Sequence, residues 1–296
     1  MRHIHFIAMA ALLLTGCGDN ENAFDATGTF EATEVVVSAE QTGRLLQFSV
    51  VEGSQVEVGE QVGLIDTVQL YLKAQQIGAT RETYASQRPD LSKQVAALRQ
   101  QLSNAELELR RAEGLVKDGA GTQKQLDDAR NAVQVLRRQL DAQLSALSNQ
   151  NASLNAQMST ADAQRYQVMD QLEKCHVRSP LTGCVLEKYA EAGEFATIGK
   201  PLFKVADMAH VFLRAYVTSA QLKDVRVGQQ VEVFADYGGG ERQAYTGTVS
   251  WISERSEFTP KTILTKDERA DLVYAVKVAV QNDGGIKIGM YGELKF

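Results

Sequence analysis

The sequence is poor in the residues from which catalytic and metal sites are usually built. Its 296 residues include four histidines, three cysteines and one tryptophan, and two of the histidines fall within the first five positions. The other two, His176 and His210, have no spacing to Cys175 or Cys184 that fits a zinc site. A phosphate-binding glycine loop and a Gly-x-Ser-x-Gly motif are also missing. The sequence therefore predicts no catalytic residues, no metal and no cofactor, and hence a protein that is not an enzyme.

Long hydrophobic runs and an excess of positive charge are missing as well. The net charge of −6 gives no general attraction to nucleic acid, so no nucleic-acid partner is expected. Outside the N-terminus, no stretch approaches the roughly 20 apolar residues that a membrane-spanning helix needs. The one hydrophobic run, from Ile4 to Leu14, is too short to span a bilayer and suits the core of a signal peptide.

This run leads into Leu14-Thr15-Gly16-Cys17, which resembles a bacterial lipobox, where small residues precede a cysteine that becomes lipidated. The pattern predicts a lipoprotein signal peptide at 1–16, lipidation of Cys17 and a polar tether at 17–29. Several acyl chains on one residue would anchor the protein stably, on the periplasmic side in a bacterium with two membranes. The alternative is an ordinary secretory signal with an incidental cysteine.

The remaining cysteines, Cys175 and Cys184, would lie in a compartment that permits a disulfide. The sequence does not show that their Cα atoms are close enough to form one. We expect two separate, buried thiols, and whether they pair is left open.

An internal repeat relates two segments that lie far apart in the sequence. Ser38 to Leu45 parallels Ser179 to Leu186, and three glycine pairs keep one constant offset in numbering without a gap. Such glycines usually supply positive φ in tight turns. Each copy has too little core to be stable alone, so the copies at 38–67 and 175–207 should close on each other as a small β-sandwich. They resemble the two halves of a biotinyl/lipoyl-like domain. The glycine pairs are Gly43 and Gly183, Gly53 and Gly193, and Gly59 and Gly199.

Between the copies, residues 68–174 carry the heptad pattern of a coiled coil. The turn at 117–122 holds two glycines and an aspartate, so the arms should be antiparallel, with Thr122 as N-cap of the second. Each arm has about 50 residues, or roughly 75 Å at 1.5 Å per residue. Pro89 predicts a break near Arg88, with Pro89-Asp90 in the first turn of a new helix. The expected seam runs through Leu91, Val95, Leu98, Leu102, Ala105, Leu109, Ala112 and Val116, and then through Leu126, Ala129, Val133, Leu136, Leu140, Leu144, Leu147, Asn151, Leu154, Met158, Ala161, Arg165, Val168 and Leu172.

The C-terminal part reads as β-structure. Four strand candidates with short spacing suggest a small β-barrel at 208–296, with a short helix at 220–225, and residues 30–37 should add a strand to the barrel. The predicted fold class is therefore α+β and elongated: a split lipoyl-like β domain, interrupted by an antiparallel helical hairpin and followed by a β-barrel. The strand candidates are 211–217, 230–235, 245–252 and 273–280.

This order of elements resembles periplasmic adaptors of the HlyD (membrane fusion protein) family, over about residues 30 to 296. Ser179 to Gly183, with Ala192-Gly193-Glu194 downstream, is similar to the family signature, and Val211 to Val217 is similar to its barrel entry. The run from Glu257 to Thr262, followed by 271–274, is similar to adaptors of ABC-type exporters.

The resemblance implies a non-catalytic adaptor that links an inner-membrane ABC-type transporter to a TolC-like outer-membrane channel for efflux or secretion. It also implies self-assembly, with six copies as the common number, and a lipid anchor in the inner membrane. An adaptor of a resistance-nodulation-division or other proton-driven pump is the alternative, although the chain after the last strand leaves little room for the membrane-proximal domain of such adaptors. The cargo, the exporter's energy source, the membrane that holds the anchor, and the role of residues 256–271 stay open.

At the hairpin tip, adaptors for TolC-like channels carry an arginine, a leucine four residues later and a serine seven residues after that. Arg111, Leu115 and Thr122 keep this spacing, with Gly119 in the turn, while Ala112 departs from the family's leucine. The resemblance implies that these four residues contact the channel. The local alternative is a solvated Arg111, a Leu115 that closes the hairpin's own core and a Thr122 that only caps its helix.

Two other functions fit parts of the sequence. A lipoyl or biotinyl carrier needs a modified lysine at the junction of the two halves, but the hairpin occupies that junction and the first half ends in Leu64-Ile65-Asp66-Thr67. A structural envelope lipoprotein would use the coiled coil as a spacer, which leaves the split domain and the barrel unexplained.

Overall fold

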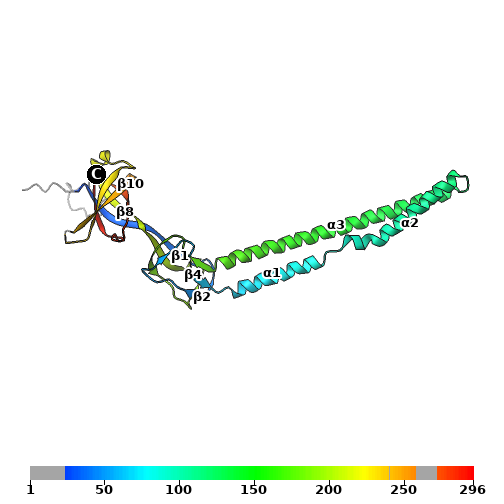
Figure 1. The fold of residues 1–296 in the computed structure, drawn as a ribbon, viewed down its shortest axis with the longest axis horizontal. Helices are drawn as coiled ribbons and strands as arrows, with labels where there is room; N and C mark the ends of the chain where they lie inside the picture. The colour runs from blue at the N-terminus through cyan, green and yellow to red at the C-terminus, as the bar shows by residue number, and fades with distance from the viewer. Residues whose placement is uncertain (1–23, 240, 258–271) are drawn as a thin grey trace, which may run out of the picture. The chain divides into compact units, whose positions relative to one another are not determined.

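The computed structural model describes residues 24–239, 241–257 and 272–296 (Figure 1). The predicted signal peptide, Cys17 and most of the predicted tether lie outside these ranges, as does most of the run that resembles ABC-exporter adaptors. Two compact units emerge, one of residues 24–39, 47–63 and the described residues after 176, the other of residues 40–46 and 64–176. The elements are β1 (Ala26–Ser38), β2 (Gly43–Phe48), β3 (Gln55–Val56), β4 (Gln61–Ile65), α1 (Val68–Ser86), α2 (Leu91–Lys117), α3 (Gln123–Glu173), β5 (His176–Arg178), β6 (Gly183–Lys188), β7 (Phe195–Ala196), β8 (Pro201–Thr218), the 3₁₀ helix η1 (Gln221–Asp224), β9 (Gln230–Asp236), β10 (Arg242–Glu257), β11 (Val273–Gln281) and β12 (Tyr291–Lys295).

The two repeats found in the sequence bond to each other reciprocally. Gly59 N donates to Ser179 O at 2.8 Å. The equivalent bond in the second repeat runs back to the first, from Gly199 N to Ala39 O at 2.8 Å. Bonds that exchange partners in this way are what a two-fold relation between the repeats produces. A second reciprocal pair runs from Ser179 N to Glu60 O (3.0 Å) and from Ala39 N to Lys200 O (2.9 Å). Bonds inside each repeat are also equivalent, as in Ser49 N to Val62 O and Tyr189 N to Leu202 O.

The repeated glycines serve two different purposes. Gly59 and Gly199 have φ of 79° and 85°, and Gly53 and its equivalent are also positive, as the sequence predicted for turn glycines. Gly43 and Gly183 do not have positive φ, so the turn interpretation is wrong for this pair. Both begin strands, and a Cβ on Gly183 would overlap a backbone oxygen of β8. At Gly183 glycine is therefore needed for the close approach of the neighbouring strand.

An eight-stranded sheet contains the predicted barrel region. Its order is β1-β12-β9-β10-β11-β8-β6-β3, and an additional pairing of β1 with β8 closes six of the strands into a ring. A four-stranded sheet has the order β5-β4-β2-β7. The closed ring holds an apolar core, because alternate side chains of each strand point inward. Buried core residues include Phe30, Val211, Leu213, Ala215, Val217, Val233, Val249, Val276, Val278, Ile286 and Leu294.

The strands differ from the sequence predictions at several places. β8 runs unbroken through the expected boundary between the second half-motif (175–207) and the barrel (208–296), where residues 208–210 bulge out of the pairing with β1. β1 begins at Ala26, inside the predicted tether, because Ala26 pairs with Leu294 of β12. Only the first part of the predicted strand 30–37 lies in the barrel, since the residues from Thr33 onward pair with β8 beyond the bulge. β12, a short and largely polar strand, was missed.

The hairpin consists of α1 and α2, which follow one another along α3 (Figure 1). All eight predicted seam positions of α2 are buried or half-buried, and only Val95 is fully enclosed. The fully buried residues of α3 all fall on its predicted seam, whereas Arg165 is exposed and does not belong to it. The seam is thus real but narrow. The buried residues of α3 are Leu126, Val133, Leu147, Leu154, Ala161 and Val168.

The predicted break at Pro89 is present, but its details differ. α1 ends at Ser86 and α2 begins at Leu91, so Pro89 lies in the connection and not in the first helical turn. Asp90 is the N-cap, and its carboxylate accepts hydrogen bonds from the backbone N–H groups of Ser92 and Lys93. These bonds help to hold the pKa of Asp90 below its ordinary value, with the Ser92 side chain as the largest cause.

Three ion pairs show how the arms are aligned. From Glu113–Arg130 (3.8 Å) to Glu106–Arg137 (2.7 Å), the position moves by one heptad along each arm, in opposite directions. Between Glu106–Arg137 and Arg81–Asp162 (2.8 Å), which lies beyond the break, the number of residues is again the same on both arms. The break therefore bends or relaxes the first arm without shifting its register against α3. Exposed pairs of this kind add little stability individually, so their value here is as markers of alignment.

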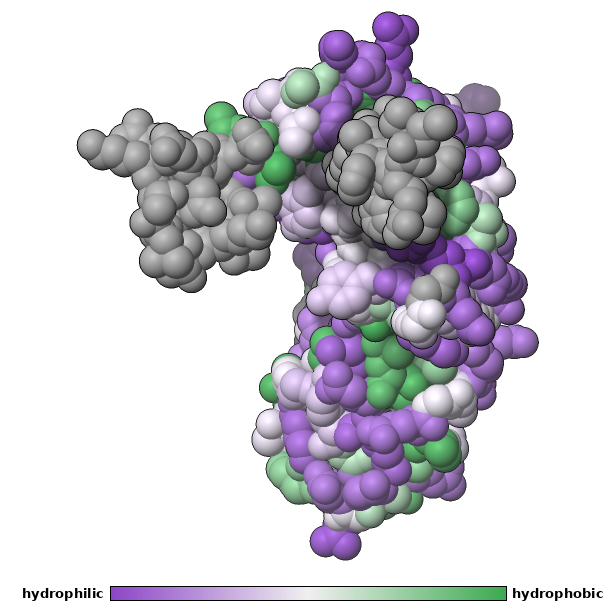
Figure 2. Space-filling view, turned by 90° about the vertical axis from the view of Figure 1, so that its left-hand side faces the viewer, coloured by the Kyte–Doolittle hydropathy of each residue, from purple (hydrophilic) through white to green (hydrophobic). Residues whose placement is uncertain are grey.

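The face of the molecule shown in Figure 2 is mainly hydrophilic. On the face shown in Figure 2, polar residues cover most of the area and hydrophobic ones form separate patches. Within the described ranges, none of the helices combines the length and hydropathy that a bilayer crossing requires. Large apolar side chains that are well exposed include Val51, Val58, Phe195 and Ile198 on the half-motifs, and Val68, Tyr71, Leu72, Tyr166 and Met169 on the hairpin.

Two glycine substitutions should change stability in opposite directions. A Cβ on Gly28 would overlap the backbone oxygen of Arg214 in β8, so Gly28→Ala should destabilise the barrel by about 1–3 kcal/mol. Gly78 lies in α1 with open space around it, so Gly78→Ala should stabilise the hairpin by about 1 kcal/mol. Thermal unfolding would be followed by fluorescence of Trp251, the single tryptophan, which lies in β10, and by circular dichroism at a helical wavelength. An unshifted barrel transition in Gly28→Ala would contradict the close approach of β1 and β8.

Candidate functional site: the tip of the helical hairpin

The turn between α2 and α3 is compact and held by its own backbone. Gly119 has φ of 74°, which reverses the chain at the end of α2. Ala120 N and Gly121 N both donate to Leu115 O, at 2.9 and 3.0 Å. A Cβ on Gly121 would lie 3.1 Å from Val116 N, so a side chain at this position would crowd the turn. The tip is therefore a fixed structure that can present side chains at defined positions.

Arg111 and Leu115 lie one helical turn apart on α2 and are both accessible. The Arg111 side chain is 61% exposed and donates to Glu108 Oε1 at 2.5 Å. Leu115 is 52% exposed, so it does not close the hairpin's own core, as the local alternative required. A guanidinium with further donors next to an exposed leucine can offer both hydrogen bonds and an apolar knob to another protein.

Thr122 has a local role. Its Oγ1 accepts from Gln125 N at 3.3 Å, and Gln125 Oε1 accepts from Thr122 N at 2.9 Å, which together form a capping box at the start of α3. The Thr122 hydroxyl also donates to Gln125 Oε1 at 3.0 Å. The predicted N-cap is confirmed, and the hydroxyl is already used within its own helix.

Two residues that shape the tip were not predicted from the sequence. Gln125 completes the capping box, and the Thr-x-x-Gln spacing from Thr122 was the signal that could have revealed it. Glu108 holds Arg111 from one turn earlier, an i,i+3 pair that is common on solvated helices. The structure brings all four predicted tip residues, Arg111, Leu115, Gly119 and Thr122, into one turn and its flanking helix ends.

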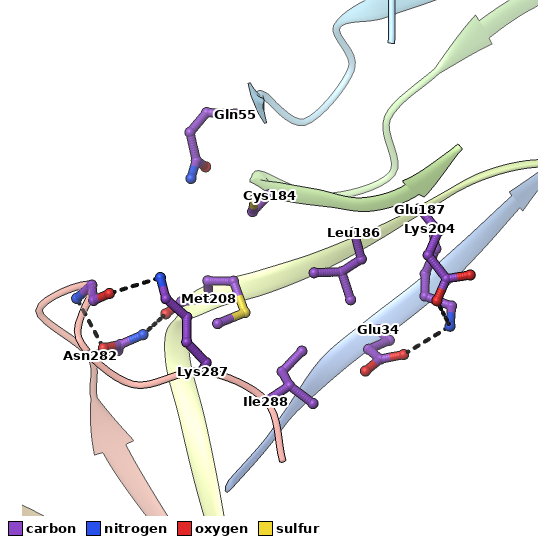
Figure 3. Close-up of a pocket in the computed structure, with 11 residues that line it drawn as sticks. Glu34, Gln55, Cys184, Leu186, Glu187, Lys204, Met208, Asn282, Lys287 and Ile288 are labelled. Carbon is purple, nitrogen blue, oxygen red and sulfur yellow. Dashed lines mark hydrogen bonds and ion pairs between the residues drawn. The ribbon is translucent and has the colours of Figure 1, made fainter. Parts of the chain in front are cut away.

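A second feature with site-like geometry is a cleft of about 450 Å³ between β6, β8 and the loop after β11 (Figure 3). Leu186, Met208 and Ile288 supply apolar surface. At one end, Lys204 bonds Glu187 at 3.2 Å and pairs with Glu34 at 3.5 Å. Hydrogen bonds from Tyr189 and Lys204 lower the pKa of Glu187, and the bond to Glu187 raises the pKa of Lys204. Lys204 is thus held between two carboxylates, those of Glu187 and Glu34.

The two cysteines of the described chain are both free. Cys175 is fully buried, and burial followed by the nearby Asp66 raises the pKa of its thiol. Cys184 is half-buried at the edge of the cleft, which corrects the prediction that both thiols are buried. Among residues 24–239, 241–257 and 272–296, no three His, Cys, Asp or Glu side chains gather as metal ligands would.

Comparison with known proteins gives relatives in sequence and in fold. No protein-family model matches the chain. A protein of Yersinia enterocolitica described as a UPF0194 membrane protein is 28% identical, over 98% of this chain and 95% of its own length.

Among solved structures, MacA from Actinobacillus actinomycetemcomitans matches with a TM-score of 0.55 and 19% identity, covering 91% of this chain and 76% of its own. A MacA–MexA chimera with the α-hairpin domain of Pseudomonas aeruginosa MexA matches with a TM-score of 0.50 and 20% identity, covering 91% and 79%. The chain therefore has the fold of these proteins, with sheet domains and a long helical hairpin.

Removing the Thr122 cap should weaken the hairpin. Thr122→Ala loses the capping box and should lower the stability of α3 by about 1 kcal/mol. Thr122→Asp keeps a good capping oxygen and should melt close to wild type. Helical circular dichroism on heating measures both. Equal losses in the two variants would show that the threonine is needed for something other than the cap.

The two thiols should differ in reactivity. Because only the thiolate reacts, a buried thiol with a raised pKa is protected, so a maleimide should modify Cys184 at least about tenfold faster than Cys175 in the folded protein. Peptide mass mapping after brief labelling distinguishes the sites, and unfolding in urea should make them equal. Faster labelling of Cys175 would contradict the burial seen here.

Proposed function

We propose that this protein is a periplasmic adaptor that links an inner-membrane ABC-type exporter to a TolC-like outer-membrane channel. It is non-catalytic in this role, and the exporter supplies the energy for efflux or secretion. The observation that carries the proposal is a long antiparallel hairpin, inserted between two half-motifs that bond to each other, whose rigid tip exposes Arg111 and Leu115. The fold shared with MacA supports the same assignment.

Docking at the tip follows from the chemistry of its residues. Arg111 would donate to carbonyl or carboxylate oxygens at the end of the channel, for which a planar guanidinium is well suited. Leu115 would fill a hole between channel helices in the manner of a coiled-coil knob. Gly119 and Thr122 act by shaping and capping the turn, because the Thr122 hydroxyl is already bonded to Gln125.

The remaining parts of the proposal concern assembly and anchoring. Several copies, six being the number that the family resemblance implies, would form a tube with the hairpin tips toward the channel. The barrel would sit on the exporter, and acyl chains on Cys17 would hold each copy at the inner membrane. A rim of tip residues from several copies gives avidity that one weak contact could not provide.

Photocross-linking in cells tests the docking. A photoreactive residue at Leu115 should capture an outer-membrane channel protein. Leu107 is the matched control, because it is an exposed leucine (41%) on the same helix about two turns further from the tip. Capture should fall at least about tenfold at Leu107, since the contact is made end-on. If Leu115 captures only copies of this protein, or if both positions capture the channel equally, the tip is not the docking site.

The same experiment with the photoreactive residue at Gln243 identifies the exporter class. Gln243 lies on β10 with an exposed side chain that bonds Asp283 at 3.0 Å. Capture of an ABC permease supports the proposed partner. Capture of a proton-driven pump subunit instead would keep the adaptor function and replace the exporter.

A further inference from the structure

Two equivalent turns of the half-motifs carry exposed apolar residues. Val58 precedes Gly59 in the first repeat and is 64% exposed, and Ile198 precedes Gly199 in the second and is 67% exposed. The two residues are related by the same offset as the repeated glycines. Because the repeats exchange equivalent bonds, the two-fold relation puts the turns on opposite sides of the axis that relates them. One copy of the chain therefore presents two separate exposed apolar turns, one on each side of this axis.

The two turns differ in shape. Beside Val58 lies an open hollow of about 700 Å³, lined by residues 55–60 and Thr182. In the second repeat, the position equivalent to Gln55 is Phe195, which is 61% exposed. The first turn thus adjoins a hollow, and the second carries two projecting apolar side chains. A surface with a hollow and a surface with projections complement each other better than either complements itself.

The charges favour the same pairing. The first turn has exposed carboxylates at Glu57 and Glu60, with the Arg178 guanidinium donating to Gly59 O at 3.0 Å. In the second turn, the position equivalent to Glu60 is Lys200, which bonds Glu194 at 2.8 Å. Joining two copies through their first turns would bring four carboxylates together, which is unfavourable. Joining a first turn to a second turn brings only two of these carboxylates into the contact, next to the Lys200–Glu194 ion pair, so fewer like charges meet.

We propose that the Ile198 turn of one copy docks into the hollow beside Val58 of the next copy. The proposal rests on the adaptor function above and assigns the surface through which copies meet. A contact between two different surfaces of the same chain is heterologous. A row of copies joined in this way keeps one free Val58 hollow at one end and one free Ile198 turn at the other, until these two meet and close a ring. The internal repeat thereby supplies both surfaces of the interface. The two turns are equivalent in the repeat and differ by substitution: the first has Gln55 and Glu60 where the second has Phe195 and Lys200.

Cross-linking between two differently tagged copies tests the pairing. One copy carries Val58→Cys and the other Ile198→Cys, both on full-length chains with Cys175→Ala and Cys184→Ala, co-expressed in cells. Isolated membranes are treated with a short bismaleimide. A product with both tags should exceed the products of either variant expressed alone by about tenfold or more, because proximity raises the effective concentration of the two thiols. The matched control replaces Val58→Cys with Val51→Cys, which is 63% exposed in the same half-motif.

The outcomes separate this proposal from the adaptor function. A dominant product from Val58→Cys alone shows a symmetric contact and overturns the proposal, as does an equal yield with Val51→Cys or no mixed product at all. Photocross-linking from Leu115 in the same membranes reports on channel docking independently. Channel capture without the mixed product supports the adaptor function and contradicts the proposed interface. The mixed product without channel capture supports the interface and contradicts docking of the tip to the channel.

Discussion

The structure depends on a small set of backbone hydrogen bonds between two segments that the whole hairpin separates in the sequence. Each half-motif leaves part of its backbone unpaired, and the other half supplies the partners, as in Gly59 to Ser179 and Gly199 to Ala39. Ile65 N also donates to Cys175 O at 2.9 Å, which joins the chain just before α1 to the chain just after α3. Because the two ends of the inserted segment are held together in this way, the segment must reverse its direction once. An antiparallel hairpin is the simplest structure that does so. Without these bonds, neither half has enough core to fold alone.

The hairpin is stabilised differently from the barrel. The barrel has a continuous apolar core, whereas α2 encloses only Val95 completely and α3 buries single residues at steps of about one heptad. Much of the hairpin's order must come from local helix energetics, including the caps at Asp90 and Thr122 and the matched charges along its arms. A narrow seam leaves most of the helix surface available for contacts with other molecules, which suits the assembly proposed above.

Periodic and repeated patterns in the sequence predicted the corresponding parts of the structure correctly. The constant offset between the repeats predicted which segments pair, and the heptads predicted the seam of α2 at every position. The predictions were wrong or incomplete where tertiary contacts determine the structure. Arg165 fits the heptad, but its side chain is exposed. β12 has no apolar alternation strong enough to be recognised, because β1 and β9 supply its pairing. At the tip, Arg111 and Leu115 were chosen through the resemblance to adaptors of TolC-like channels, and their docking role stays a prediction. The use of the Thr122 hydroxyl became visible only with the geometry of Gln125.

The most direct test of the account is to shorten the hairpin without disturbing its seam. The ion pairs show that residues 72–78 lie across from 165–171, so deleting both segments removes one heptad from each arm and about 10 Å of length. Complexes trapped by a reversible cross-linker would be purified from cells through a tag on this chain and analysed by mass spectrometry. The account predicts that the full-length protein brings down both an inner-membrane exporter and an outer-membrane channel, and that the shortened protein keeps the exporter and loses the channel. A channel recovered equally with both proteins, or with neither, would contradict it.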